Sequence, residues 1–237
     1  MRQASVSGCV VVEAANTTDE IPWLLQLSDQ SPLIHGVVGW LDWDQPGIRA
    51  TLDTYRTHPR FVGARLNWFG DNWSDNAQVR SNLTVFDAFG LTCDVLTRPE
   101  LIPDLIALIR DYPNTRFVIN HLAGSGLTPD GASAWKAAMT PLQSQPNVYL
   151  KFSGFLSQLP VTDTDQTMIA DYLDAALDIL GEHRLLFASN YPISLRVTPD
   201  YATPLAVLQP ILAQHHHHTQ QNILHNNALD AYRLVMD

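Results

Sequence analysis

The stretch Val37-Val38-Gly39-Trp40 is apolar at every position, and so is the earlier stretch Cys9-Val10-Val11-Val12. Each is too short for a helix and lacks the polar alternation of a half-exposed strand, which is typical of strands covered on both faces. Similar runs recur along the rest of the chain. The predicted strands are Cys9–Glu13, Gly36–Leu41, Val62–Asn67, Leu91–Leu96, Arg116–His121, Val148–Phe152 and Leu185–Ser189.

Segments with helical spacing of apolar residues lie between the strands, for example 48–55, 101–109 and 169–180. We expect helix starts after Asp19 and Asp44 and a helix end at Gly181. Strands that alternate with helices predict βα units and a parallel sheet. The fold class is therefore α/β, like a (β/α)8 TIM barrel, in one domain over residues 1–237.

The pattern contains about seven βα units, whereas a closed barrel of this kind has eight strands. The residues before Cys9 are too few for a strand and its crossover helix. Either the first unit is missing from this polypeptide, or the sheet is open or closed in an unusual way. An incomplete barrel leaves unpaired edges that invite pairing with another chain, so a homodimer is one expectation.

Composition narrows the class of partner. Lys and Arg number 14 against 24 Asp and Glu, a balance that disfavours nucleic acid and anionic membranes, because both attract basic surfaces. No apolar run is long enough to span a membrane, and no signal-peptide pattern precedes the first strand. Cys9 and Cys93 lie in apolar runs and are expected to be buried free thiols. We therefore expect a cytoplasmic protein.

Working groups in parallel α/β folds lie at the carboxyl ends of the strands. There, His121 is followed by a glycine-containing loop, and its imidazole is suited to metal binding or general acid–base chemistry, or to a structural hydrogen bond. Lys151 interrupts an apolar strand and needs an anion, either a substrate or a carboxylate of the protein. Arg65 carries a guanidinium suited to carboxylates.

Other strand-end residues leave two interpretations open. Asp94 either contacts substrate or balances one of the cations inside the barrel. Trp40 and Tyr191 either wall a substrate cleft or pack as ordinary aromatic residues. Asn190 lies between Ser189 and Tyr191, just after the last predicted strand.

In this order and spacing the segments resemble the amidohydrolase-related barrel proteins, often described as metal-dependent hydrolases, which include sugar-acid and dicarboxylate lactonases. Asn120-His121-Leu122-Ala123 is similar to the family's Asp-His-Leu-Gly, and Phe187-Ala188-Ser189-Asn190-Tyr191-Pro192 to its Phe-Gly-Ser-Asp-Trp-Pro. Residues 147–154 resemble its Asn-Val-Tyr-Cys-Lys-Leu-Ser-Gly, and 226–234 its closing helix. The resemblance implies a hydrolase with His121, Asn190 and Lys151 at catalytic positions.

Two departures from the family bear on mechanism. The family's first strand carries His-x-His, which nothing before Cys9 supplies, and its aspartate at position 190 is an asparagine here, whose amide cannot accept a proton at neutral pH. A catalytic zinc normally has three protein ligands. Only His121 remains of the implied ligand set, so a divalent, zinc-like metal there is expected to bind weakly and no cofactor is assigned.

These observations lead to three hypotheses. In the first, Arg65 and Lys151 hold a substrate carboxylate, with Asp94, Trp40 and Tyr191 around it, His121 polarises a lactone carbonyl, and water attacks. In the second, the barrel binds a small organic acid, or serves in an assembly, without turnover. In the third, the chain is a shortened version of an ordinary enzyme.

Overall fold

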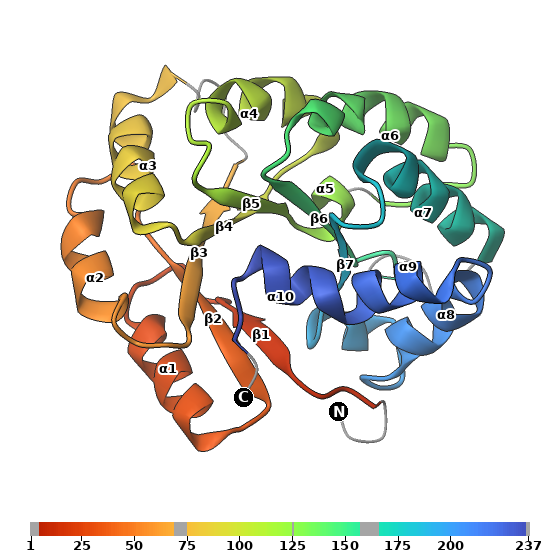
Figure 1. The fold of residues 1–237 in the computed structure, drawn as a ribbon, viewed down its shortest axis with the longest axis horizontal. Coiled ribbons are helices and arrows are strands. Elements are labelled where there is room, and N and C mark those ends of the chain that lie inside the picture. Colours follow the sequence, from red (N-terminus) through yellow and green to blue (C-terminus); the bar gives the residue numbers. More distant parts are fainter. Residues whose placement is uncertain (1–4, 69–74, 125, 157–165, 236–237) are drawn as a thin grey trace.

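The computed structural model describes residues 5–68, 75–124, 126–156 and 166–235. Seven strands form one parallel sheet in which each strand pairs with the next along the chain, so the order is β1-β2-β3-β4-β5-β6-β7. The sheet curls as in a TIM barrel, with most helices outside it (Figure 1). The strands are β1 (Cys9–Val12), β2 (Ile34–Trp40), β3 (Phe61–Asn67), β4 (Thr92–Leu96), β5 (Arg116–Ile119), β6 (Val148–Phe152) and β7 (Leu185–Phe187).

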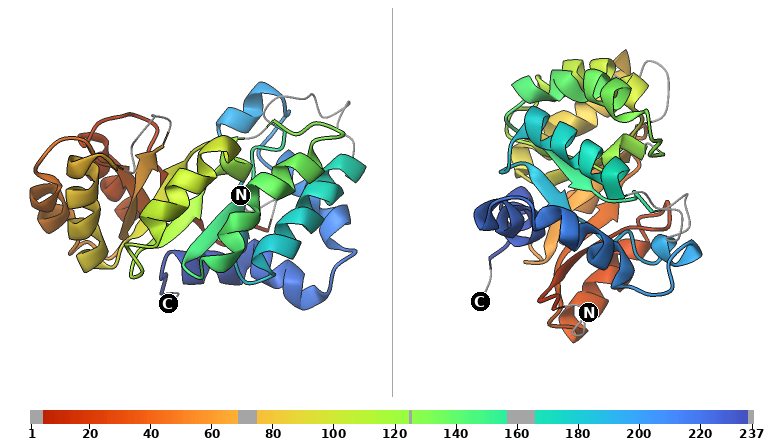
Figure 2. Two further views of the ribbon diagram at one scale, coloured as in Figure 1. Left: turned by 90° about the horizontal axis from the view of Figure 1, so that it is seen from above. Right: turned by 90° about the vertical axis from the view of Figure 1, so that its right-hand side faces the viewer.

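The helices mostly follow the strands in alternation, as the periodicity predicts, and most of them wrap along one side of the sheet (Figure 2). They are α1 (Glu20–Gln30), α2 (Ile48–Tyr55), α3 (Ala77–Phe89), η3 (Pro99–Leu101), α4 (Ile102–Ile109), α5 (His121–Gly124), α6 (Ala132–Met139), η4 (Thr140–Ser144), α7 (Gln166–Leu180), η6 (Ile193–Arg196), α8 (Thr203–Leu212), α9 (His217–Gln221), η7 (Asn222–Asn226) and α10 (Asn227–Ala231).

The sheet separates two apolar cores. The larger lies between the sheet and the helices and includes Ala64, Leu66 and Phe117. The smaller lies on the concave side and is built by alternate strand residues together with the C-terminal segment; its members are Val38, Val62, Val118, Tyr149, Leu186, Ala231 and Tyr232. Side chains alternate between the two faces of a strand, so Asn120 and Lys151, two residues after Val118 and Tyr149, face the same interior nearer the carboxyl ends.

The C-terminal segment closes the amino-terminal end of the concave side. Thr92 Oγ1 at the start of β4 donates to the carbonyl of Ala231 at 2.7 Å, and Arg116 at the start of β5 forms an ion pair with Asp230 at 3.0 Å. The opposite end, where the strands finish, is therefore the end at which a site can open.

Most predicted boundaries agree with the structure within two residues, and three details differ. The helix after Asp44 begins at Ile48 with Gly47 at its N-cap position, so the predicted cap at Asp44 is wrong. Gly47 occupies the N-cap position because the backbone there has a φ of 109°, which glycine adopts readily and other residues rarely do. Asp19 stands at the N-cap of α1 but makes no side-chain capping bond. β7 ends at Phe187, before the predicted Ser189.

Other predictions from sequence have mixed outcomes. Gly181 ends α7 with φ 68°, as predicted. Both cysteines are free, but only Cys93 is fully buried, while Cys9 is half-buried. Among the described residues no helix has the length and apolar character needed to cross a membrane. In the same part of the chain β1 pairs only with β2, and β7 only with β6, so the homodimer stays a prediction.

Candidate functional site

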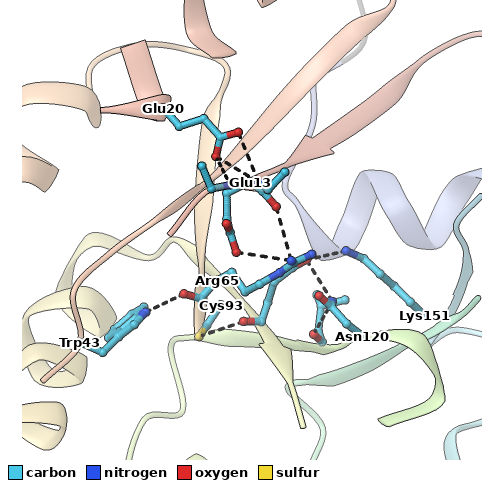
Figure 3. A network of polar contacts seen from close by, with 11 residues as sticks. Glu13, Glu20, Trp43, Arg65, Cys93, Asn120 and Lys151 are labelled. Atoms are coloured by element: carbon cyan, nitrogen blue, oxygen red, sulfur yellow. Dashed lines mark hydrogen bonds and ion pairs between the residues drawn. The ribbon is translucent and has the colours of Figure 1, made fainter. Parts of the chain in front are cut away.

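A polar layer lies above the small core, at the carboxyl ends of β3 to β6. Arg65, Asp94, Asn120 and Lys151 come from four neighbouring strands, and in register Arg65 lies opposite Asp94. Figure 3 shows Arg65, Asn120 and Lys151 converging on one region. The sequence predicted Arg65, Asp94 and Lys151 singly, and the curvature of the sheet brings them together with Asn120.

Asp94 is the centre of this layer. Its side chain is fully buried; Oδ2 accepts from Lys151 Nζ and from Asn120 Nδ2 at 3.0 Å, and Oδ1 accepts from the Tyr232 hydroxyl at 2.7 Å. The Lys151 ammonium also lies 5.6 Å from the centre of the Tyr232 ring. Of the two partners open for Lys151, the structure supplies the carboxylate of the protein, and Asp94 balances that cation.

Arg65 connects Asp94 to the end of β1. Its Nη1 donates to the Glu13 carbonyl and lies 3.4 Å from Glu13 Oε1. The carbonyl of Arg65 accepts from Trp43 Nε1 at 2.7 Å, and the Trp43 ring packs edge-on against Phe86. Trp43 therefore fixes the strand at Arg65 from the helix side and is a packing residue.

His121 lies just after the end of β5 at Ile119. Its Nδ1 forms a 2.8 Å hydrogen bond with Ser153 Oγ, which leaves Nε2 as the ring nitrogen available to a ligand. Burial, together with the positive charges of Lys151 and Arg65, lowers the pKa of His121 to about 3. The imidazole is therefore neutral at physiological pH.

The backbone around His121 is left-handed. Residues His121, Leu122 and Ala123 have φ values of 52°, 53° and 59°, a conformation that costs non-glycine residues roughly 1–2 kcal/mol each. Leu122 and Ala123 are fully buried, and the carbonyl of Leu122 accepts from Trp135 Nε1 at 3.0 Å. Packing thus holds a turn that local preference opposes, a pattern that clusters at functional sites.

Gly154 joins this turn to the region of Asn190. With φ at 76°, a Cβ added to Gly154 would lie 3.0 Å from the Cβ of His121. Gly154 also lines a small pocket with Ser189 and Asn190. The predicted pair His121 and Asn190 therefore flanks the same glycine, and Asn190 itself has a φ of 52°.

Several buried polar atoms at the strand ends have no hydrogen-bond partner within the described ranges. They are Arg65 Nε, Asn67 Oδ1, Thr97 Oγ1 and Asn120 Oδ1, from β3, the end of β4 and the end of β5. Leaving a buried polar group without a partner costs about 1–3 kcal/mol, so their grouping favours a polar ligand at this end of the sheet.

The two aromatic candidates differ in setting. Trp40 ends β2, is half-buried, and lies opposite Arg65 in register. Tyr191 is 56% exposed and its ring meets Tyr201 edge-on at 5.5 Å between centroids. Trp40 therefore adjoins the polar layer, whereas Tyr191 lies on the surface beyond Asn190.

Sequence reasoning gave no role to Tyr232, Ser153 or Glu13. Tyr232 lies 138 residues after Asp94, and no local pattern signals their contact. Ser153 and Glu13 did carry a signal, since both stand at strand ends next to apolar runs. Only the structure shows that Ser153 holds His121 and that Glu13 contacts Arg65.

A family model described as Amidohydrolase matches residues 2–234, which is nearly the whole chain. The chain belongs to this amidohydrolase family. The family predicted from the strand-end motifs, and with it the hydrolase class, is confirmed.

Named relatives of this amidohydrolase include lactonases. An L-fucono-1,5-lactonase of Burkholderia ambifaria is 29% identical over 197 residues, which cover 82% of this chain and 68% of the relative. A second L-fucono-1,5-lactonase, from Burkholderia multivorans, is 29% identical over 213 residues, which cover 82% of this chain and 70% of that relative.

Solved structures confirm the fold. An amidohydrolase from Burkholderia multivorans with bound zinc superposes with a TM-score of 0.91 at 24% identity, covering 99% of this chain and 86% of that one. A putative 2-pyrone-4,6-dicarboxylic acid hydrolase from Pseudomonas putida superposes with a TM-score of 0.81 at 20% identity, covering 98% of this chain and 84% of that one. Both likenesses support the TIM-barrel-like architecture.

The described residues of this amidohydrolase do not fit a zinc centre. They contain no group of three His, Cys, Asp or Glu side chains that could hold a metal ion together. His121 stands alone as an imidazole beside two cations, and Asp94 is already bonded to three partners. This part of the chain suits an anionic or polar ligand better than a cation.

Proposed function

We propose that this amidohydrolase hydrolyses a lactone of a small carboxylic acid. The observation that carries the proposal is a neutral, half-buried His121 beside the cations Arg65 and Lys151 at the carboxyl end of the sheet. The named relatives, L-fucono-1,5-lactonases, support a lactone as the substrate class.

His121 would act on the carbonyl oxygen of the lactone. When the Ser153 hydroxyl donates to Nδ1, the neutral ring carries its proton on Nε2, which can then donate to the carbonyl oxygen. Such a donor stabilises the negative charge that develops there as water attacks. The low pKa keeps the ring in this neutral form throughout turnover.

Arg65 would hold the carboxylate or hydroxyl groups of the substrate. Its Nε is buried and unpartnered within the described residues, so a substrate oxygen would satisfy it. Lys151 would act through its charge, since its ammonium is bonded to Asp94. Asp94 would thus support the site from behind, and Trp40 would border it.

A second candidate function is binding of a small organic acid without turnover. Asn190 favours it, because an amide replaces the aspartate expected from the family pattern. Both candidates use the same polar layer, and they differ in whether water is activated.

Turnover separates the two candidates. The purified chain is incubated with a panel of aldonic-acid 1,4- and 1,5-lactones and 2-pyrone-4,6-dicarboxylate, and proton release is followed, with Asn190→Asp assayed alongside. Hydrolysis above the spontaneous rate is the expected result. If neither protein hydrolyses any lactone, with or without added zinc, while hydroxy acids raise the melting temperature, the binding function replaces the enzymatic one.

A further inference from the structure

Two carboxylates lie in or beside the polar layer, Asp94 and Glu13, and they differ in what they can still bind. Both oxygens of Asp94 are engaged, by Lys151, Asn120 and Tyr232, and its side chain is fully buried. Glu13 has one oxygen, Oε1, near Arg65, whereas Oε2 has no hydrogen-bond partner among the described residues. Only Glu13 therefore has an oxygen free to accept a proton from water.

Glu13 is held in place by the backbone on both sides. Its N–H donates to the carbonyl of Val38 at 2.9 Å, which extends the pairing of β1 with β2 by one residue. The loop that follows is fixed by Glu20, whose carboxylate accepts from the N–H groups of Ala14 and Ala15 at 3.0 and 3.1 Å. Figure 3 shows the Glu13 carboxylate turned toward Arg65.

Position 190, where the family pattern has an aspartate, supplies no base here, because the Asn190 amide cannot take up a proton. We propose that Glu13 is the general base that activates the attacking water, with Arg65 holding its carboxylate at 3.4 Å beside the substrate group that Arg65 binds. This inference rests on the proposed lactone hydrolysis. It assigns a catalytic role to the end of β1, on the opposite edge of the sheet from Asn190.

The step balances without any further reactant. Glu13 accepts a proton from water as the water oxygen bonds to the lactone carbonyl carbon, whose oxygen takes the negative charge. The bond between that carbon and the ring oxygen then breaks, and the ring oxygen receives the proton from Glu13. The products are a hydroxy acid and the regenerated carboxylate.

The proton affinities of the two carboxylates differ in the direction that this role requires. Burial raises the pKa of Glu13, and the charges of Glu20 and Asp94 add to that rise, while Arg65 opposes it. Burial also acts on Asp94, but Lys151 and Arg65 together hold the pKa of Asp94 below its usual value. Opposite shifts of this kind separate the carboxylate that exchanges protons from the one that stays ionised.

The test compares Glu13→Gln and Glu13→Asp with the unmodified chain on the best lactone of the panel. The Gln variant keeps a side-chain oxygen for Arg65 but loses the base, so we expect kcat/KM to fall about 10²- to 10⁴-fold. The acid limb of the pH profile of kcat/KM should also disappear in that variant. The Asp variant should keep part of the rate and the acid limb.

Glu182→Gln is the matched control, because Glu182 precedes β7 at the other end of the strands and bonds to Thr219 and His218. It should keep the rate and pH profile of the unmodified chain. Melting temperatures of all variants separate loss of base from loss of fold. If Glu13→Gln folds and keeps its rate within about threefold, Glu13 is not the base while lactone hydrolysis stands. If the unmodified chain hydrolyses no lactone, both proposals fall.

Discussion

His121 should make the stability of this protein depend on pH below neutrality. Its pKa is about 3 in the folded protein, against 6.5 for the free side chain, because of burial and the nearby charges of Lys151 and Arg65. The unfolded chain therefore binds a proton at this position at mildly acidic pH, and the folded chain does not. Since the folded pKa is the lower one, the stabilisation is complete above pH 6.5 and declines as the pH falls toward 3.

The size of this effect follows from the two pKa values. At pH 5 the unfolded imidazole is almost fully protonated and the folded one is not, which lowers the free energy of unfolding by about 2 kcal/mol relative to pH 8. The variant His121→Asn should lose this contribution. Asparagine suits the position, because it tolerates the left-handed backbone and can still bond to Ser153.

Urea unfolding at pH 8, 7, 6 and 5, followed by tryptophan fluorescence, measures the effect. The difference in unfolding free energy between the unmodified chain and His121→Asn should shift by about 2 kcal/mol across this range, to the disadvantage of the unmodified chain at low pH. His217→Asn removes an exposed histidine and should follow the unmodified chain. A difference that stays constant with pH would show that His121 titrates alike in the folded and unfolded chain and would contradict this prediction.

Two further predictions concern the buried contacts around the site. Lys151→Met leaves the fully buried Asp94 without its cation and should lower the free energy of unfolding, measured with urea, by about 3–5 kcal/mol. The double variant Lys151→Met with Asp94→Asn should recover most of that loss. Equal losses in the single and double variants would contradict a stabilising ion pair. Gly154→Ala places a Cβ at positive φ against His121, while Gly181→Ala has the same strain with no neighbour within 4 Å. Each should lose about 1–2 kcal/mol from strain, and a larger loss in Gly154→Ala is the expected mark of the contact.

The sequence alone determined the strands and helices of this protein, because their signals are local. Apolar runs such as 9–12 and 37–40 indicate strands, although β1 at the edge of the sheet is only half-buried, and the segments between them carry helical spacing. Chain direction then fixes which residues stand at the carboxyl ends of parallel strands. Arg65, Asp94, His121 and Lys151 could be proposed on this basis without any knowledge of distances.

The contacts that these residues make depend on the tertiary structure. Lys151 could have met a substrate or a carboxylate, and its pairing with Asp94 depends on the curvature that brings β4 and β6 to one centre. Tyr232 reaches Asp94 because the C-terminal segment folds under the strands. Within the described part of the chain, Glu13 has a carboxylate oxygen without a hydrogen-bond partner, whereas both oxygens of Asp94 are engaged. Such contacts join residues far apart in the chain, and ionisable groups take their properties from burial and neighbours, so no local pattern contains them.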